Sequence, residues 1–171
     1  MADVEALSRP GPFADPLTER IAGFIRGVGI GLEAATLAAP CPCPGVLARR
    51  GVLHVDETRL AYPGDLLHEA GHVAVCDPAL RRVRDDIGND PAEEMAAMAW
   101  SYAAARQLGI DPAIVFHDGG YRGWSETLIE SFERGGAPGA PMLEWFGMTL
   151  GARAAADRGA QPFPYMLRWM R

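Results

Sequence analysis

The segment Asp65–Val75 constrains the fold of this chain more than any other part of the sequence. It carries His68, Glu69 and His72 in a His-Glu-x-x-His pattern within a largely apolar run. On a helix, residues four apart lie about one turn apart on one face, so both imidazoles can bind one tetrahedral metal ion. Glu69 follows the first histidine, and its carboxylate therefore points toward a water molecule on the metal rather than toward the metal itself.

The residues around this segment predict a buried helix with defined ends. Pro63-Gly64 is a turn signal, Asp65 is a suitable N-cap, and Cys76-Asp77-Pro78 ends the apolar run. Such a short pattern also arises by chance. A buried helix, however, carries two histidines and a glutamate only when they have partners, because unpaired polar groups in an apolar interior cost several kcal/mol. We therefore expect a metal site here.

Composition limits the class of protein. The chain has 171 residues, of which 49% are hydrophobic and 22% are charged, as expected for one domain with a moderate core. The net charge of -6 and the absence of a basic stripe argue against nucleic acid as a partner. No apolar run reaches the roughly 18 residues that span a membrane, and the acidic N-terminus does not resemble a signal peptide. We expect a cytoplasmic protein that is not bound to a membrane.

The three cysteines suggest neither a disulfide framework nor a second metal site. Cys41 and Cys43 alternate with prolines, which favours an extended connector with free thiols. A Cys-x-Cys pair can bind metal, but no second cysteine or histidine pair accompanies it. Cys76 follows the apolar run and is expected to be a small buried residue.

Hydrophobic periodicity predicts the other elements and an α+β fold. We expect helices over 16–28, from Pro91 to near Gly109 and over 125–132, strands over 30–37 and 51–57, and core packing from 142–148 and the aromatic tail 163–169. The small sheet would pack on the central metal-binding helix, beside a second helix that carries a ligand. Residues 1–171 would form one domain, with the metal helices in 1–112 and a smaller C-terminal lobe in 113–171.

A third metal ligand must come from elsewhere in the chain, because a catalytic zinc usually has three protein ligands and one open position. Position 78, six residues after His72, is a proline, which excludes the arrangement with three histidines in one extended motif. His54 is on a predicted strand, where a lone histidine is more often a surface residue. Glu93 and Glu94 lie 21 and 22 residues after His72, in the first turn of the second predicted helix. Asp90, Pro91 and Glu93 also match a capping box.

Over residues 62–105 the chain resembles the gluzincins, zinc metallopeptidases of the zincin group that include the thermolysin-like and ImmA/IrrE-type peptidases. In the latter, the ligand glutamate is followed by Ala at the third position, an aromatic residue at the sixth and a small residue at the seventh. Counted from Glu94, these positions hold Ala97, Trp100 and Ser101. The resemblance thus implies Glu94, rather than Glu93, as the third ligand.

The resemblance also implies partners for the metal ligands and for the substrate. The Asp or Asn often found four residues after the ligand glutamate is replaced by Met98, so the sequence names no outer partner for a ligand histidine. Downstream, a glycine-rich loop carries His117, Tyr121 and Arg122. Peptidases of this kind use such a donor to stabilise the oxyanion; His117 and Tyr121 are our candidates, with Arg122 as an alternative. The same loop also fits a surface turn.

The resemblance implies a zincin-like hydrolase that acts on a peptide or protein substrate. His68, His72 and Glu94 would hold Zn²⁺, and Glu69 would be the catalytic base that activates water at the metal. The alternative is a zincin-fold regulatory or partner-binding protein that holds a metal without hydrolytic activity, because 171 residues leave little chain for an extended cleft. The sequence does not determine the oligomeric state or the substrate.

Overall fold

A computed structural model of the chain describes residues 4–9, 13–38, 41, 43–85 and 90–171. Its four strands form one mixed sheet with the order β1-β2-β4-β3. The strands are β1 (Val4–Arg9), β2 (Gly31–Leu37), β3 (Val46–Arg49) and β4 (Val52–Val55). Strands β2 and β4 are parallel, whereas β1 pairs antiparallel with β2 and β3 pairs antiparallel with β4. The fold is α+β, as the sequence predicted.

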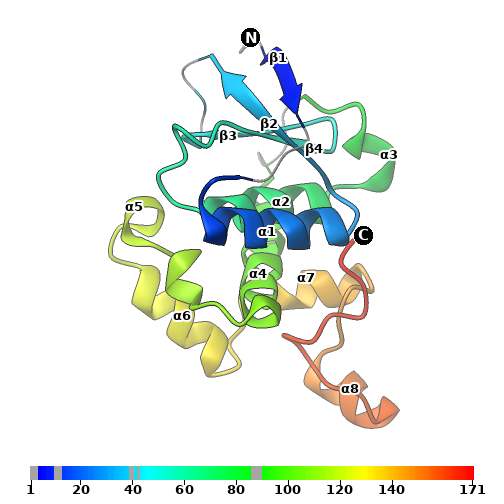
Figure 1. The fold of residues 1–171 in the computed structure, drawn as a ribbon. Helices are drawn as coiled ribbons and strands as arrows, with labels where there is room; N and C mark the ends of the chain where they lie inside the picture. The colour runs from blue at the N-terminus through cyan, green and yellow to red at the C-terminus, as the bar shows by residue number, and fades with distance from the viewer. Residues whose placement is uncertain (1–3, 10–12, 39–40, 42, 86–89) are drawn as a thin grey trace.

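Helices α1 (Pro16–Gly27) and α2 (Asp65–Val75) lie beneath the sheet, and α4 (Pro91–Leu108) passes beneath α2 (Figure 1). The shorter helices are α3 (Pro78–Arg81), the 3-10 turn η1 (Pro112–Ile114), α5 (Asp118–Tyr121), α6 (Ser125–Glu133), α7 (Ala140–Trp145) and α8 (Ala152–Arg158). Helix α2 is buried along most of its length, as its apolar sequence predicted. It is therefore the centre of the core.

A glycine allows α2 and α4 to pack closely. A Cβ atom on Gly71 would lie 2.7 Å from the carbonyl oxygen of Ala97, which is closer than real Cβ contacts. Helix α4 begins at Asp90, whose side chain accepts a hydrogen bond from the Ala92 amide at 2.8 Å, and it ends at Gly109 in the left-handed conformation. The close crossing at Gly71 fixes the distance between the two helices near the first turns of α4.

The aromatic C-terminal tail packs against this helix pair. The indole of Trp100 on α4 donates a hydrogen bond to the Trp169 carbonyl at 2.9 Å, and the two rings meet edge to face. At the end of α2, the guanidinium of Arg81 donates to the Val73 carbonyl at 2.8 Å, and the Arg171 amide donates to the Ala74 carbonyl at 3.0 Å. These contacts satisfy carbonyl groups that a helix end leaves unpaired. The prediction that the tail packs on the core is confirmed.

The longer helices and two of the strands agree with the predicted periodicity, and the differences lie in the short elements and in one helix cap. The predicted helices correspond to α1, α2, α4 and α6, and the predicted strands to β2 and β4. The elements that were not predicted are short: β1, β3, α3, η1, α8 and α5, the last in a stretch expected to be a glycine-rich loop. The prediction that Asp65 is the N-cap of α2 is wrong: Gly64 is the N-cap, and Asp65 is the first helical residue. In the described part of the chain, no helix is long and apolar enough to cross a membrane.

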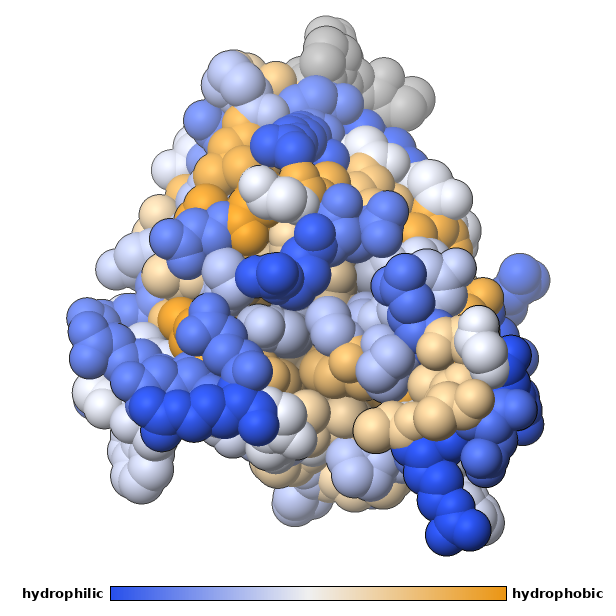
Figure 2. All heavy atoms as spheres, turned by 90° about the horizontal axis from the view of Figure 1, so that it is seen from below, coloured by the Kyte–Doolittle hydropathy of each residue, from blue (hydrophilic) through white to orange (hydrophobic). Residues whose placement is uncertain are grey.

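The lower part of the molecule contains α6, α7 and α8, and α7 begins close to Met95 near the start of α4 (Figure 1). Viewed from below, this face is hollowed between two projecting lobes, of which the left is mainly hydrophilic and the right has both hydrophobic and hydrophilic surface (Figure 2). A cavity of about 390 Å³ lies between α6, α7 and residues 149–152, and its lining is mostly apolar. It shares no lining residue with the cavity beside the two histidines of α2.

Candidate metal centre

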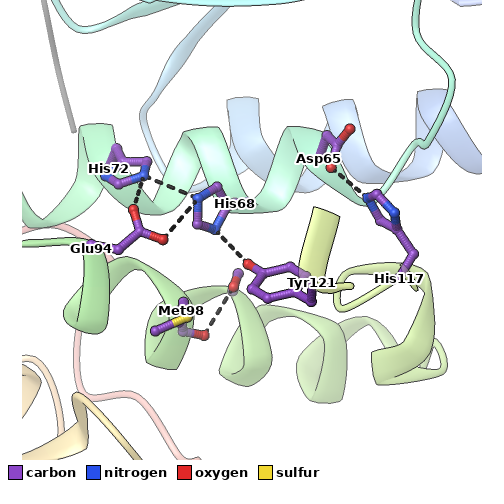
Figure 3. A network of polar contacts seen from close by, with 8 residues as sticks. Asp65, His68, His72, Glu94, Met98, His117 and Tyr121 are labelled. Atoms are coloured by element: carbon purple, nitrogen blue, oxygen red, sulfur yellow. Dashed lines mark hydrogen bonds and ion pairs between the residues drawn. The ribbon is translucent and has the colours of Figure 1, made fainter. Parts of the chain in front are cut away.

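His68, His72 and Glu94 meet at the crossing of α2 and α4 (Figure 3). The Nε2 atoms of the two histidines are 3.1 Å apart. One carboxylate oxygen of Glu94 lies 3.5 Å from His68 Nε2, and the other lies 3.1 Å from His72 Nε2. The structure thus brings together the three residues that the sequence and the resemblance named as metal ligands.

These separations fit a tetrahedral ion. Ligand atoms at about 2.0–2.2 Å from a zinc-sized ion in tetrahedral geometry are roughly 3.3 Å from one another. The two Nε2 atoms are 3.1 Å apart, close to that value, and a different oxygen of Glu94 faces each of them, at 3.5 Å from His68 and 3.1 Å from His72. His72 is buried at this point, whereas His68 and Glu94 are partly exposed toward the cavity side, so an ion could reach the three side chains. The donor set therefore fits a metal.

The other carboxylate of α4 points elsewhere. Glu93 forms an ion pair with Arg84, with 3.3 Å between Glu93 Oε2 and Arg84 Nη1. Glu94, one residue later, faces the crossing and reaches both imidazoles. The choice of Glu94 over Glu93 thus agrees with the geometry. Glu93, expected to cap the start of α4, also forms an ion pair with Arg84.

The hydroxyl of Tyr121 contacts His68 on the side of the imidazole ring opposite Glu94. The hydroxyl oxygen lies 3.2 Å from His68 Nδ1, the ring nitrogen that faces away from Glu94 (Figure 3). When Nε2 binds a metal, Nδ1 carries the proton and donates it to the tyrosine oxygen. Tyr121 thus supplies a hydrogen-bond partner for a proposed ligand histidine. In the peptidases that the chain resembles, an Asp or Asn often stands where this chain has Met98. For His72, Nδ1 is buried and has no hydrogen-bond partner among the described residues.

Burial and charge set the protonation of the ligands. Burial, together with the adjacent His72, lowers the pKa of His68 to about 4. Burial alone would lower the pKa of His72, but the hydrogen bond to Glu94 and the charges of Glu69 and Glu94 outweigh it and raise that pKa. The hydrogen bond from His72 lowers the pKa of Glu94. The site therefore offers a neutral imidazole at His68 and an ionised carboxylate at Glu94.

Glu69 lines a cavity beside the three ligands. The cavity has a volume of about 340 Å³, at the small end of the range of ligand sites. Its lining residues are Cys43, Pro44, Tyr62, Asp65, His68, Glu69, Glu94, His117, Gly119, Gly120 and Tyr121. Burial, with a smaller effect of nearby carboxylates, raises the pKa of Glu69 to about 7. A carboxylate with this pKa can exchange a proton near neutral pH.

Tyr121 also keeps its own proton. Burial and the nearby carboxylates of Glu94, Asp65 and Glu69 raise the pKa of the tyrosine hydroxyl. The hydroxyl oxygen can accept a hydrogen bond from His68 while its hydrogen points elsewhere. Because Tyr121 lines the cavity, that hydrogen is available to a group bound there.

His117 lies on the cavity wall, but both of its ring nitrogens have partners. Nε2 lies 2.8 Å from Asp65 Oδ1, and Nδ1 accepts a hydrogen bond from the Gly120 amide at 3.2 Å. The ring stacks on Tyr62 with 3.7 Å between centroids. The sequence assigned Asp65 to helix capping and missed this contact, because a partner 52 residues away leaves no local signal.

The other candidates lie away from the cluster. Arg122 is exposed and is not among the residues that line the cavity. His54 on β4 lies 3.9 Å from Glu33, and burial lowers its pKa.

Cys43, expected to be a connector thiol, instead lines the cavity, where burial and the charges of Asp65 and Glu69 raise its pKa and keep the thiol protonated. Cys76 is fully buried, as expected.

Comparisons of the chain with protein-family models, with curated proteins and with solved structures give no match. The function must therefore be argued from the geometry of the site.

Proposed function

We propose that this protein is a zinc-dependent hydrolase of the zincin type that cleaves peptide bonds. His68, His72 and Glu94 hold the ion, and Glu69 is the catalytic base. The observation that carries the proposal is the convergence of two imidazole nitrogens and one carboxylate at 3.1–3.5 Å, next to a carboxylate with a pKa of about 7. The gluzincin-like spacing of residues 62–105 supports peptide as the substrate class.

Zinc, when bound, would polarise a substrate carbonyl and lower the pKa of bound water to about 7. Glu69 lies one residue after His68, so its carboxylate faces the cavity beside the ligands. In its ionised form Glu69 accepts a proton from the attacking water, and afterwards it donates that proton to the leaving amine. The group must take up and release one proton in each cycle, and its place on the cavity wall next to His68 suits both steps.

Tyr121 would stabilise the charge that develops on the carbonyl oxygen. Its hydroxyl is protonated, lines the cavity and is held 3.2 Å from a ligand histidine. A preoriented donor of this kind stabilises an oxyanion more than it stabilises the neutral carbonyl. His117, whose two ring nitrogens already have partners, is not oriented for this role.

The first test is metal content. We expect close to one equivalent of zinc in the purified protein, and loss of that zinc in His68→Ala and in His72→Ala. His54→Ala is the matched control, because His54 lies on the sheet away from the cluster and should leave zinc content unchanged. Wild-type protein that takes up no zinc when the metal is supplied would contradict the proposal.

The second test separates an enzyme from a metal-binding protein without activity. Glu69→Gln keeps the size of the side chain but removes the proton acceptor. Hydrolysis of a peptide library should fall by roughly 10²–10⁴-fold, while zinc content stays at the wild-type level. Equal cleavage by both proteins would exclude Glu69 as the base. Zinc binding without cleavage of any peptide by wild type would favour a regulatory or partner-binding role.

A further inference from the structure

We propose that Asp65 and His117 form a positioning pair that holds Tyr121 against the metal ligand His68. In this assignment neither member of the pair contacts substrate. Their effect on the site passes through the tyrosine hydroxyl. The inference rests on the metal-binding part of the proposed function and does not require that the bound substrate is a peptide.

The segment that carries Tyr121 has little intrinsic rigidity. Between His117 and Trp124 it contains Gly119, Gly120 and Gly123, and its one helix, α5, has only four residues. Glycine loses more backbone freedom than any other residue on ordering, so such a segment needs tertiary contacts to keep one conformation. Those contacts must come from a more rigid part of the molecule.

His117 supplies two such contacts, to Asp65 and Tyr62, and one more within the segment itself. Its Nε2 lies 2.8 Å from Asp65 Oδ1 in the first turn of α2, and its Nδ1 accepts from the Gly120 amide at the start of α5. Its ring stacks on Tyr62. Gly119 permits this stack, because a Cβ there would lie 2.7 Å from the Tyr62 hydroxyl. The histidine therefore ties the glycine-rich segment to the metal-binding helix.

The hydrogen bonds determine which nitrogen carries the proton. Since Nδ1 accepts from the Gly120 amide, a neutral His117 has its proton on Nε2 and donates it to Asp65. No ring nitrogen remains for a substrate. A donor to the oxyanion requires a free N–H, so the geometry favours a positioning role for His117 over direct contact with substrate.

The two residues that contact each other's segment are about one helical turn apart both on α2 and on α5. Asp65 and His68 are three residues apart on α2 and therefore lie on the same face of a rigid helix. His117 and Tyr121 are four residues apart across one turn of α5. The segment thus docks on α2 at two points, His117 on Asp65 and Tyr121 on His68, as Figure 3 shows. Loss of the first contact would leave the second with less support, from the packing of the Tyr121 ring on Phe116 and the core.

A double-mutant cycle on metal affinity tests this inference. His117→Phe keeps a ring that can stack on Tyr62 but removes both nitrogens. We expect it to weaken zinc binding about tenfold or more, as Tyr121→Phe should, because each removes support for a ligand histidine. The double variant should bind zinc no more weakly than Tyr121→Phe alone. Additive losses would overturn the inference, because independent effects add.

Substitutions at Asp65 provide the conservative control. Asp65→Asn keeps an oxygen that accepts from His117 Nε2–H and should retain zinc affinity within about threefold, whereas Asp65→Ala should match His117→Phe. Equal weakening by Asn and Ala would point to the charge of Asp65 and contradict the hydrogen-bonded pair.

A measurement on the metal-free protein separates this inference from the proposed function. Amide hydrogen exchange over residues 118–124 should be faster in His117→Phe and in Asp65→Ala than in wild type and in Asp65→Asn. Unchanged exchange would overturn the positioning role even if zinc binds. Faster exchange in a protein that binds no zinc would support the positioning role and reject the metal centre.

Discussion

The hydroxyl of Tyr121 lies 3.2 Å from Nδ1 of His68, although 53 residues separate them in the chain. Nε2 of the same imidazole faces Glu94 and His72. Histidines that bind metal through one ring nitrogen almost always donate a proton from the other, and Tyr121 is placed to accept it from His68 Nδ1. His72 has no such partner among the described residues. The two histidines of the motif are therefore not equivalent.

Removal of this acceptor should weaken the metal site. Tyr121→Phe keeps the ring and its packing but leaves the proton on His68 Nδ1 without a partner. We expect zinc affinity to fall about tenfold or more, measured by competition with a chromophoric chelator. Tyr165→Phe is the control, because Tyr165 is half exposed and lies outside the cavity lining. Equal affinities for the two variants would contradict the role of Tyr121.

The two glutamates at the start of α4 should behave differently. Glu94→Gln removes the carboxylate that reaches both imidazoles, so zinc content after dialysis should fall well below one equivalent. Glu93→Gln breaks only the ion pair with Arg84, which should cost about 1 kcal/mol or less of unfolding free energy and leave zinc bound. The opposite ranking in metal analysis would show that the wrong carboxylate has been assigned.

Glu69 should make the metal-free protein less stable at high pH. Burial raises its pKa from 4.5 to about 7, so its contribution to stability is complete below pH 4.5 and is lost as the pH rises through 7. Glutamine does not titrate. Relative to wild type, Glu69→Gln should therefore gain up to about 3 kcal/mol of unfolding free energy between pH 4.5 and pH 8.

Denaturant unfolding in the presence of a chelator measures this difference at each pH. Titrating groups far from Glu69 contribute similarly to both proteins and largely cancel in the comparison. The exception is His72, whose pKa the charge of Glu69 raises, so its titration shifts with the substitution. A difference in unfolding free energy that does not change with pH would show that Glu69 has an ordinary pKa in the folded protein.

Glycine-to-alanine substitutions should have opposite effects in α2 and α1. Gly71→Ala places a Cβ 2.7 Å from the Ala97 carbonyl and should push α2 and α4 apart, at a cost of about 1–3 kcal/mol and with weaker zinc binding. Gly23→Ala, where nothing lies within 4 Å, should stabilise the protein by about 0.5–1 kcal/mol. Thermal unfolding and zinc titration of both variants check this. A tolerated Gly71→Ala would disprove the close crossing.

The amino-acid sequence alone was sufficient to predict helices α2 and α4 and the two histidines of the candidate metal centre. The spacing of His68 and His72 requires only one helical turn, and Asp90 and Pro91 specify the start of α4 through contacts within a few residues. Such features depend on local backbone geometry, so they are visible in the order of residues. The apolar character of Asp65–Val75 likewise predicted its burial.

Tertiary structure decided which side chains meet those ligands. The resemblance named Glu94, but only the crossing at Gly71 shows that this carboxylate reaches the imidazoles while Glu93 turns to an arginine. The contacts of His117 with Asp65 and of Tyr121 with His68 join segments more than 50 residues apart. No periodicity encodes such a contact, because it depends on how packed elements place a flexible segment. Hydrogen bonds between residues close in the sequence determine the helices and their caps. Packing of the whole core determines which residues of different elements come into contact.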